Sequence, residues 1–200
     1  MIKRLIALFA APFLLTACGT TMTSQDFAET NPKLILEEYF EGETHAYGLF
    51  EDRFGNVRNQ FTVMVDGQWD GETLTLDEDF IYTNGDTEYR KWEIKKTGPN
   101  TYRGVTQQII GEAEGVISGN SFNWKYKFKL KVGDDIWNVR FDDWMFLQPD
   151  GVLLNKARVY RWGFKIGTVF LSFSKNKAAA AQGIAAASRN ERLRLAVNND

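Results

Sequence analysis

Apolar and polar residues alternate without a break along residues 121–132, SFNWKYKFKLKV. Lysines occupy most of the polar positions, and the apolar positions are Phe122, Trp124, Tyr126, Phe128, Leu130 and Val132. Because neighbouring side chains on a strand point to opposite faces, this alternation predicts a strand with one buried face and one face in water. The lysine face has two interpretations: a solvated outer surface, or a surface that meets anionic lipid head groups.

Turn signals divide the chain from His45 to Ser174 into short segments. The signals are Gly55-Asn56, Gly67, Asn84-Gly85, Gly98-Pro99-Asn100, Gly119-Asn120, Gly133-Asp134 and Asp150-Gly151. The segments between them are rich in Val, Ile, Thr and aromatic residues and show no helical period. This pattern predicts an all-β fold over residues 32–174, an antiparallel up-and-down, lipocalin-like barrel of about 8–10 strands, closed so that no strand edge is exposed.

The two ends of the chain differ from the predicted barrel. Residues 1–17 contain a basic start and an apolar stretch and end in the first three residues of LTAC, at 15–18; together they resemble a cleaved bacterial lipoprotein signal. We therefore expect Cys18 to be lipidated and residues 18–31 to form a tether behind the membrane anchor. The tail, residues 175–200, is rich in Ala and Arg and has the composition of a short helix.

The residue after the expected lipidation site indicates a location. It is Gly19 rather than an aspartate. In the lipoproteins of enteric bacteria, which this N-terminus resembles, that choice implies sorting to the outer membrane. The expected location is therefore the bacterial cell envelope, as an outer-membrane lipoprotein that faces the periplasm.

Composition and charge limit the kinds of site that the chain can form. The chain has 200 residues, is 44% hydrophobic and carries a formal net charge of −2, so it can bury a core but has no basic surplus for nucleic acid. Cys18 is the only cysteine and His45 the only histidine. No disulfide can form within the chain, and a zinc site or a serine-protease type of triad lacks the residues that it needs. We predict no catalytic residue, no metal ligand and no cofactor, although a metal site built of oxygen ligands alone stays open, and the sequence favours a binding protein over an enzyme without deciding between them.

Three segments place acidic residues among aromatic ones. Strand parity predicts that Asp52, Glu78 and Asp143 point inward, whereas Asp142 points outward. If residues 102–118 form one kinked strand, these segments are the first, third and seventh strands and run the same way. Their acids would then approach the same end of the barrel. A carboxylate in an apolar interior needs either a partner or a proton.

Two further polar residues are predicted on the inward faces of neighbouring strands. Arg90 follows the Asn84-Gly85 turn and can reach Glu78, and Asn155 follows the Asp150-Gly151 turn and can reach Asp143. These residues indicate either an internal polar network that fixes strand register or the polar part of a ligand cavity. The expected aromatic lining consists of Phe80, Trp92, Trp124, Tyr126 and Phe141.

Four long stretches and the LTAC motif carry a family resemblance. The stretches are YFEGETHAYGLFEDRFGNVRNQF, DGQWDGETLTLDEDFIYTNGDTEYRKW, GEAEGVISGNSFNWKYKFKL and FDDWMFLQPDGVLLNKARVYRWGFKIG. They resemble an uncharacterised family of predicted proteobacterial lipoproteins with a lipocalin-like domain of unknown function. Members of that family are associated with genes for fatty-acid modification, so the resemblance implies work related to lipids without implying a defined activity.

Three functions are compatible with these features. The first is a lipoprotein that binds or carries a fatty acyl or other apolar ligand in its barrel, because an aromatic interior with a few polar groups is typical of a pocket. The second is a structural or interaction module of the envelope with a filled barrel. The third is a lipid-modifying enzyme in which a protonated Glu78 or Asp143 acts as general acid–base. The predicted partners are the membrane, through a diacylglyceryl Cys18, and an apolar small molecule or lipid.

Overall fold

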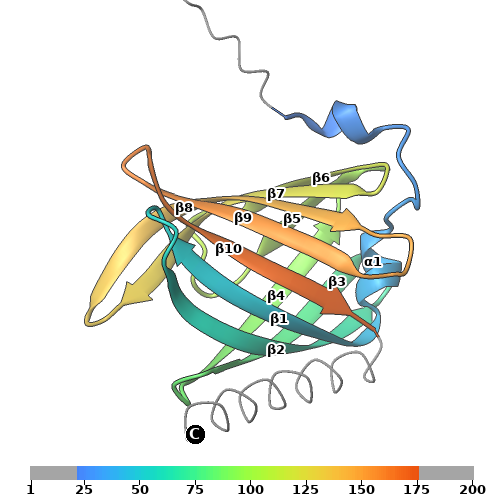
Figure 1. The fold of residues 1–200 in the computed structure, drawn as a ribbon. Coiled ribbons are helices and arrows are strands. Elements are labelled where there is room, and N and C mark those ends of the chain that lie inside the picture. The colour runs from blue at the N-terminus through green and yellow to red at the C-terminus, as the bar shows by residue number, and fades with distance from the viewer. Residues whose placement is uncertain (1–21, 176–200) are drawn as a thin grey trace, which may run out of the picture.

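A computed structural model describes residues 22–175 of the chain as a closed barrel of ten strands (Figure 1). The strands are β1 Gly42–Asp52, β2 Val57–Trp69, β3 Thr73–Tyr82, β4 Thr87–Lys96, β5 Thr101–Val105, β6 Ala113–Ser118, β7 Ser121–Val132, β8 Asp135–Leu147, β9 Leu153–Arg161 and β10 Phe164–Ser174. Each strand pairs antiparallel with its sequence neighbours, and β1 pairs with β10 to close the sheet. The predicted all-β, antiparallel up-and-down barrel is therefore confirmed.

One prediction about the strand count is wrong. Residues 102–118 do not form one kinked strand but belong to β5 and β6, which are separated by residues 106–112. A single bridge, between Ile109 and Phe128, ties this connection to β7. The segment that carries Asp143 is consequently β8, and in a meander β8 runs opposite to β1 and β3.

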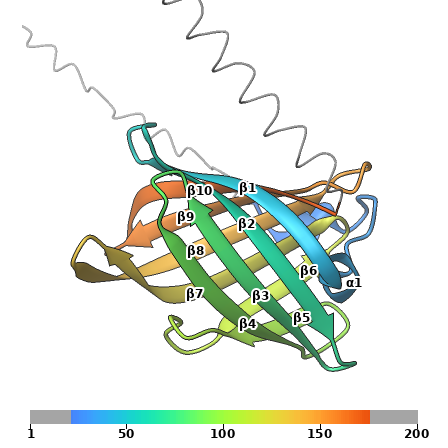
Figure 2. The same cartoon turned by 90° about the horizontal axis from the view of Figure 1, so that it is seen from below.

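A short helix covers one end of the barrel. Helix α1, Leu36–Phe40, lies at the other end of the barrel from the turns that join β1 to β2 and β9 to β10 (Figure 1, Figure 2). Leu36 and Phe40 are buried in the core, and the Phe40 ring packs edge-on against Phe173 at 5.5 Å. A Cβ at Gly67 would overlap the Phe40 carbonyl oxygen, so glycine is required where β2 passes the helix. We call this the helix end of the barrel and the opposite end the far end.

Polar contacts hold α1 in place. The Glu37 carboxylate accepts hydrogen bonds from the Lys96 ammonium at 2.5 Å and the Tyr102 hydroxyl at 2.7 Å. Burial of Glu37 raises its pKa, but these hydrogen bonds and the Lys96 charge outweigh that effect and lower it. The helix end is therefore closed by both apolar packing and a charged pair.

The segment before α1 packs against the outer wall of the barrel. It contains a 3₁₀ helix, η1, Ser24–Phe27, whose Phe27 ring lies 5.7 Å from Trp144 and 5.1 Å from Phe146. Farther along, the Asn120 backbone N–H donates to the Thr30 hydroxyl at 3.0 Å. Trp144 points outward from β8 yet is only 4% exposed, because Phe27 of this segment covers it. Of the expected tether, residues 22–31 thus lie on the barrel.

Several expectations fall on residues outside the described part. These are the signal peptide 1–17, the lipidated Cys18 with the start of the tether, and residues 176–200 of the tail. Among residues 22–175, no helix has the length and apolar character needed to cross a membrane.

Candidate functional site

Glu78 and Arg90 lie opposite each other on β3 and β4, with their side chains inside the barrel. Parity places Glu78 on the face that β3 buries with Leu76 and Phe80, as the sequence predicts. Burial raises the pKa of Glu78 to about 7, against the opposing charge of Arg90 and with a small addition from Glu88. Glu78 accepts no hydrogen bond from any residue that the structure describes.

Arg90 is held by a carboxylate and two aromatic rings. Its Nη2 donates to Glu88 Oε1 at 2.7 Å, and its guanidinium lies 4.6 Å from the centre of the Phe80 ring and 4.9 Å from that of Phe128. Its Nε is buried and has no hydrogen-bond partner among the described residues. Sequence analysis missed Glu88, although it lies two positions before Arg90 and therefore on the same face of β4.

Asp143 and Asn155 form the second part of the site, on β8 and β9. The Asn155 side-chain amide donates to Asp143 Oδ1 and, at 3.2 Å, to the Trp144 carbonyl. Burial raises the pKa of Asp143 to about 7; the hydrogen bond from Asn155 opposes the rise, and the charges of Asp142 and Glu78 add to it. The second carboxyl oxygen of Asp143 has no hydrogen-bond partner within residues 22–175.

Tyr126, on β7, connects these two parts. Its ring stacks on Phe141 at 4.8 Å and meets Trp92 edge-on at 5.4 Å. Its burial and the charge of Asp143 raise its pKa well above the usual value, with Arg90 opposing and Glu78 adding to the rise. The sequence analysis treated it only as lining, but its hydroxyl belongs to the site and makes no hydrogen bond to a described residue. We call Glu78, Arg90, Tyr126, Asp143 and Asn155 the interior polar group.

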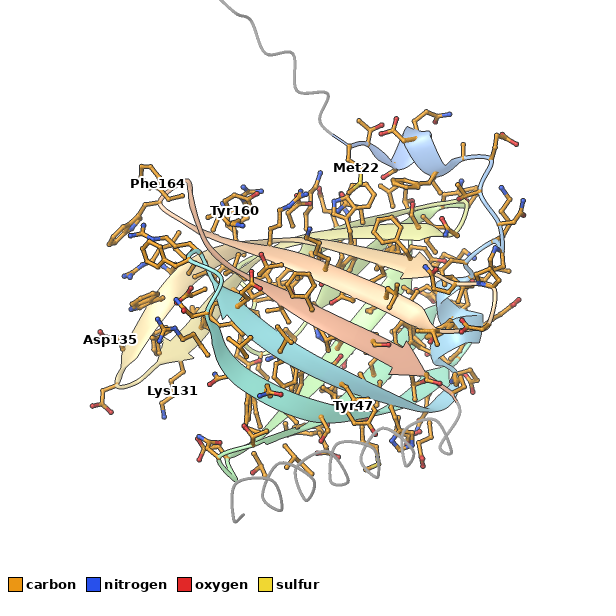
Figure 3. All side chains as sticks on the ribbon, viewed as in Figure 1. Met22, Tyr47, Lys131, Asp135, Tyr160 and Phe164 are labelled. Atoms are coloured by element: carbon orange, nitrogen blue, oxygen red, sulfur yellow. The ribbon has the colours of Figure 1, made fainter. Side chains whose placement is uncertain are left out.

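The interior polar group is not tightly enclosed on every side. Glu78, Arg90 and Tyr126 point inward but are only partly buried. By contrast, the other predicted lining residues are at most 9% exposed: Phe80, Trp92, Trp124 and Phe141. Figure 3 shows side chains from all sides of the barrel reaching into its interior. Polar atoms with unused hydrogen-bonding capacity thus lie among packed aromatic rings.

Asp52, which the sequence analysis grouped with these residues, makes its hydrogen bonds elsewhere. It lies at the far end, where its carboxylate accepts hydrogen bonds from the Phe54 and Asn56 backbone N–H groups and pairs with Arg58 at 2.6 Å. Some desolvation raises its pKa, but the hydrogen bonds from Asn56, Arg58 and Phe54 lower it to about 2. Asp52 therefore stabilises the β1–β2 turn. The register shift between Phe50 and Glu51 belongs to β2, where Arg58 is the extra residue, so β1 keeps a regular register against β10 as far as Asp52.

Asp142 lies on the outer face of β8, as parity predicts. It accepts a hydrogen bond from the Asn123 amide at 3.0 Å and pairs with Arg158 at 3.6 Å. The pair of adjacent acids in the sequence is therefore divided between the two faces of one strand.

Two other features of the described residues bear on the choice of site. A hollow of about 550 Å³ lies on the outer wall over β1, β9 and β10, lined mainly by outward side chains that include Leu49, Leu154 and Phe170. Asn155 of the interior polar group is among its lining residues, whereas Glu78, Arg90, Tyr126 and Asp143 are not. Residues 22–175 contain no group of three or more His, Cys, Asp or Glu side chains arranged to hold a metal ion.

Comparisons with known proteins give the fold and the family. A crystal structure of a protein of unknown function from the DUF3598 family of Nostoc punctiforme is similar with a TM-score of 0.52 at 12% identity. The similarity covers 72% of this chain but only 49% of that one, so this chain spans about half of its length, and the likeness concerns the fold alone. A search of curated proteins found no match. The family DUF3833, described as a protein of unknown function, matches residues 12–175. Because this match covers most of the chain, the protein belongs to the DUF3833 family.

Proposed function

We propose that this protein is an outer-membrane lipoprotein, anchored through an acylated Cys18 on the periplasmic side, whose barrel binds an apolar molecule that bears one polar group. The signal-like sequence of residues 1–18 supports the anchor and the location. The interior polar group and its aromatic surroundings support the ligand.

One observation carries the ligand proposal: the Glu78 carboxyl lies inside the barrel without a hydrogen-bond partner among the described residues. Glu78 is partly buried, and a desolvated polar group without a partner costs free energy, so a ligand that supplies the partner gains on binding. The buried Nε of Arg90 and the hydroxyl of Tyr126 offer two further unused positions beside it. A ligand with an apolar chain would lie against the rings while its polar group meets these atoms.

The charges around the site limit which polar group that ligand can bear. Arg90 is already paired with Glu88, whereas Glu78 and Asp143 have no cation of their own at hydrogen-bond distance. A free carboxylate would bring a third negative charge to this pair, which is unfavourable in a poorly hydrated interior. A hydroxyl or an amine would instead donate to the two carboxyls. The proposed ligand is therefore an amphiphile with a hydroxyl or amine rather than a fatty-acid anion.

Titration calorimetry with three amphiphiles of equal chain length tests this proposal: dodecanol, dodecylamine and dodecanoate. At about pH 8, where carboxyls with a pKa of about 7 are mostly ionised, dodecylamine should bind most tightly and dodecanoate least. Lowering the pH to about 6 should weaken the binding of dodecylamine and strengthen the binding of dodecanoate, because Glu78 and Asp143 then take up protons.

Two variants locate the effect. Glu78→Gln should reduce the preference for dodecylamine, whereas Asp79→Asn, which removes an exposed carboxylate from the same strand, should leave it unchanged. Dodecanoate binding as tightly as dodecylamine at about pH 8 would contradict the proposed head group. Absence of binding by all three amphiphiles would contradict the ligand proposal itself.

A filled barrel that serves as an interaction module of the envelope is the second candidate. The packing of the interior favours it, because the Trp124 ring lies 5.8 Å from the Trp92 ring and 5.4 Å from the Phe122 ring. In that case native mass spectrometry of protein extracted from its own membrane would show the mass of the chain without a bound lipid.

A further inference from the structure

Large apolar side chains project from three turns at the far end of the barrel. Phe54 in the β1–β2 turn is 73% exposed, Ile136 beside the β7–β8 turn 69%, and Trp162 and Phe164 at the β9–β10 turn 82% and 72%. Figure 3 shows Phe164 and Asp135, the neighbour of Ile136, at this end, away from α1. We call these four residues the apolar rim.

The three hairpins of the apolar rim are neighbours around the barrel. The strand order β2, β1, β10, β9, β8, β7 places the β1–β2, β9–β10 and β7–β8 hairpins side by side. The next hairpin, β3–β4, ends in the polar turn of residues 83–86, TNGD. The four residues of the apolar rim therefore occupy one arc of the far end, and Ile81 of β3, which is 58% exposed beside the polar turn, lies outside this arc.

The turn that carries Trp162 is unfavourable for this residue. Trp162 and Gly163 join paired Arg161 and Phe164 as a two-residue turn, with φ values of 52° and 85°. A bulky side chain is disfavoured at positive φ, and Asn-Gly is the usual sequence in such a turn. Since Trp162 is mostly exposed, burial in the barrel does not explain its presence. The Arg161 guanidinium lies 4.1 Å from the Trp162 ring and 3.8 Å from the Trp137 ring. These contacts hold the Trp162 indole at the rim.

Cationic side chains accompany the apolar tips. Arg53 lies over the Phe54 ring at 4.6 Å, Arg161 precedes Trp162, and Lys165 follows Phe164. The β7–β8 turn also carries Asp134 and Asp135, so the positive charge is concentrated at the other two hairpins.

We propose that the apolar rim docks onto the surface of a phospholipid bilayer. Trp162, Phe164, Phe54 and Ile136 would enter the interface, and Arg53 and Arg161 would lie beside phosphate groups. Aromatic residues with neighbouring cations are suited to this boundary, which is apolar on one side and charged on the other. Separate tips on three turns suit a lipid surface better than a protein partner, which needs a continuous, closely packed face.

This orientation has a consequence that rests on the proposed function. The far end would face the lipid, while α1 closes the end that points away. An apolar ligand would then pass between bilayer and barrel without crossing bulk water.

Spin labels on the full chain test the docking. Cys18→Ser removes the native thiol and any acyl anchor, and a nitroxide is attached at Lys165→Cys, next to the rim, or at Asn84→Cys, in the polar β3–β4 turn of the same end. With vesicles of phosphatidylethanolamine and phosphatidylglycerol, the label at position 165 should gain accessibility to oxygen and lose accessibility to a water-soluble nickel complex. The label at position 84 should show no such shift.

A double variant, Trp162→Asn with Phe164→Thr, should abolish the shift at position 165 while the protein stays folded by circular dichroism. An unchanged signal at position 165 on addition of vesicles overturns the proposal, and so does an equal shift at positions 84 and 165. Immobilisation of the label at position 165 that depends on protein concentration, without lipid, would indicate a second copy as the partner and also overturns it. Because Glu78→Gln should leave the shift intact, failure of ligand binding and failure of docking are distinguishable.

Discussion

Replacing Glu78 by glutamine should change the pH dependence of stability by a predictable amount. Burial raises the pKa of this carboxyl from 4.5 to about 7, so the folded state holds the proton more tightly than the unfolded state. The stabilisation from this proton is complete below about pH 4.5 and is lost as the pH rises to about 7. Since a tenfold change in proton affinity is worth about 1.4 kcal/mol, the loss for wild type is about 3 kcal/mol.

Glutamine is nearly isosteric and cannot ionise, so the Glu78→Gln variant lacks this loss. Its free energy of unfolding relative to wild type should therefore rise by about 3 kcal/mol between about pH 4 and about pH 8. Urea unfolding followed by tryptophan fluorescence over this range measures the difference, and Asp79→Asn controls for the removal of one carboxylate. If the free energies of unfolding of Glu78→Gln and wild type ran parallel with pH, Arg90 or water would be stabilising the carboxylate. Glu78 would then not be an acid without a partner.

Three further substitutions test other parts of the structure. Trp162→Asn should stabilise the barrel by about 1 kcal/mol in urea unfolding, because asparagine tolerates the positive φ; a loss of stability would show that the indole packs more than its exposure indicates. Gly67→Ala should cost about 2–3 kcal/mol, because the new methyl displaces the Phe40 carbonyl and with it α1, which a lower melting temperature would show. Asn155→Ala should cost about 1–3 kcal/mol, mostly above about pH 7 where Asp143 is ionised; equal destabilisation at low pH would contradict this role of the amide.

The sequence predicts the interior of this protein well where the strands are regular. Alternation is a local property, so parity alone places Glu78, Arg90, Asp143 and Asn155 on inward faces. It cannot say which strands meet across the barrel, because that depends on the number and direction of all strands. The acids at positions 78 and 143 do interact, but they belong to strands of opposite direction rather than to strands that run the same way.

The failures have physical causes that are visible in particular residues. Asp52 is the last residue of β1, and its carboxylate bonds to the turn that follows, which alternation within a strand cannot show. The connection at residues 106–112 lacks a strong turn pair, so the boundary between β5 and β6 is not marked in the sequence. The hydroxyl of Tyr126 escaped notice because tyrosine at an apolar position is usually counted as a ring, and only the neighbouring charges reveal its polar role.

The two ends of the barrel differ in ways that decide where a ligand can enter. Opening the helix end would separate Glu37 from Lys96 and Tyr102 and would expose Leu36 and Phe40, which are almost fully buried. On the far-end side of Glu78, the next inward residues of β3 are Phe80 and Tyr82, and rotation of a ring can open a path without breaking the sheet. The Tyr82 ring packs against Phe61 at 5.5 Å, and its hydroxyl donates a hydrogen bond of 3.0 Å to Glu88, the residue that also pairs with Arg90. A ligand entering there would therefore meet both Tyr82 and Arg90 through the Glu88 carboxylate, at the same end of the barrel as the proposed lipid-facing rim.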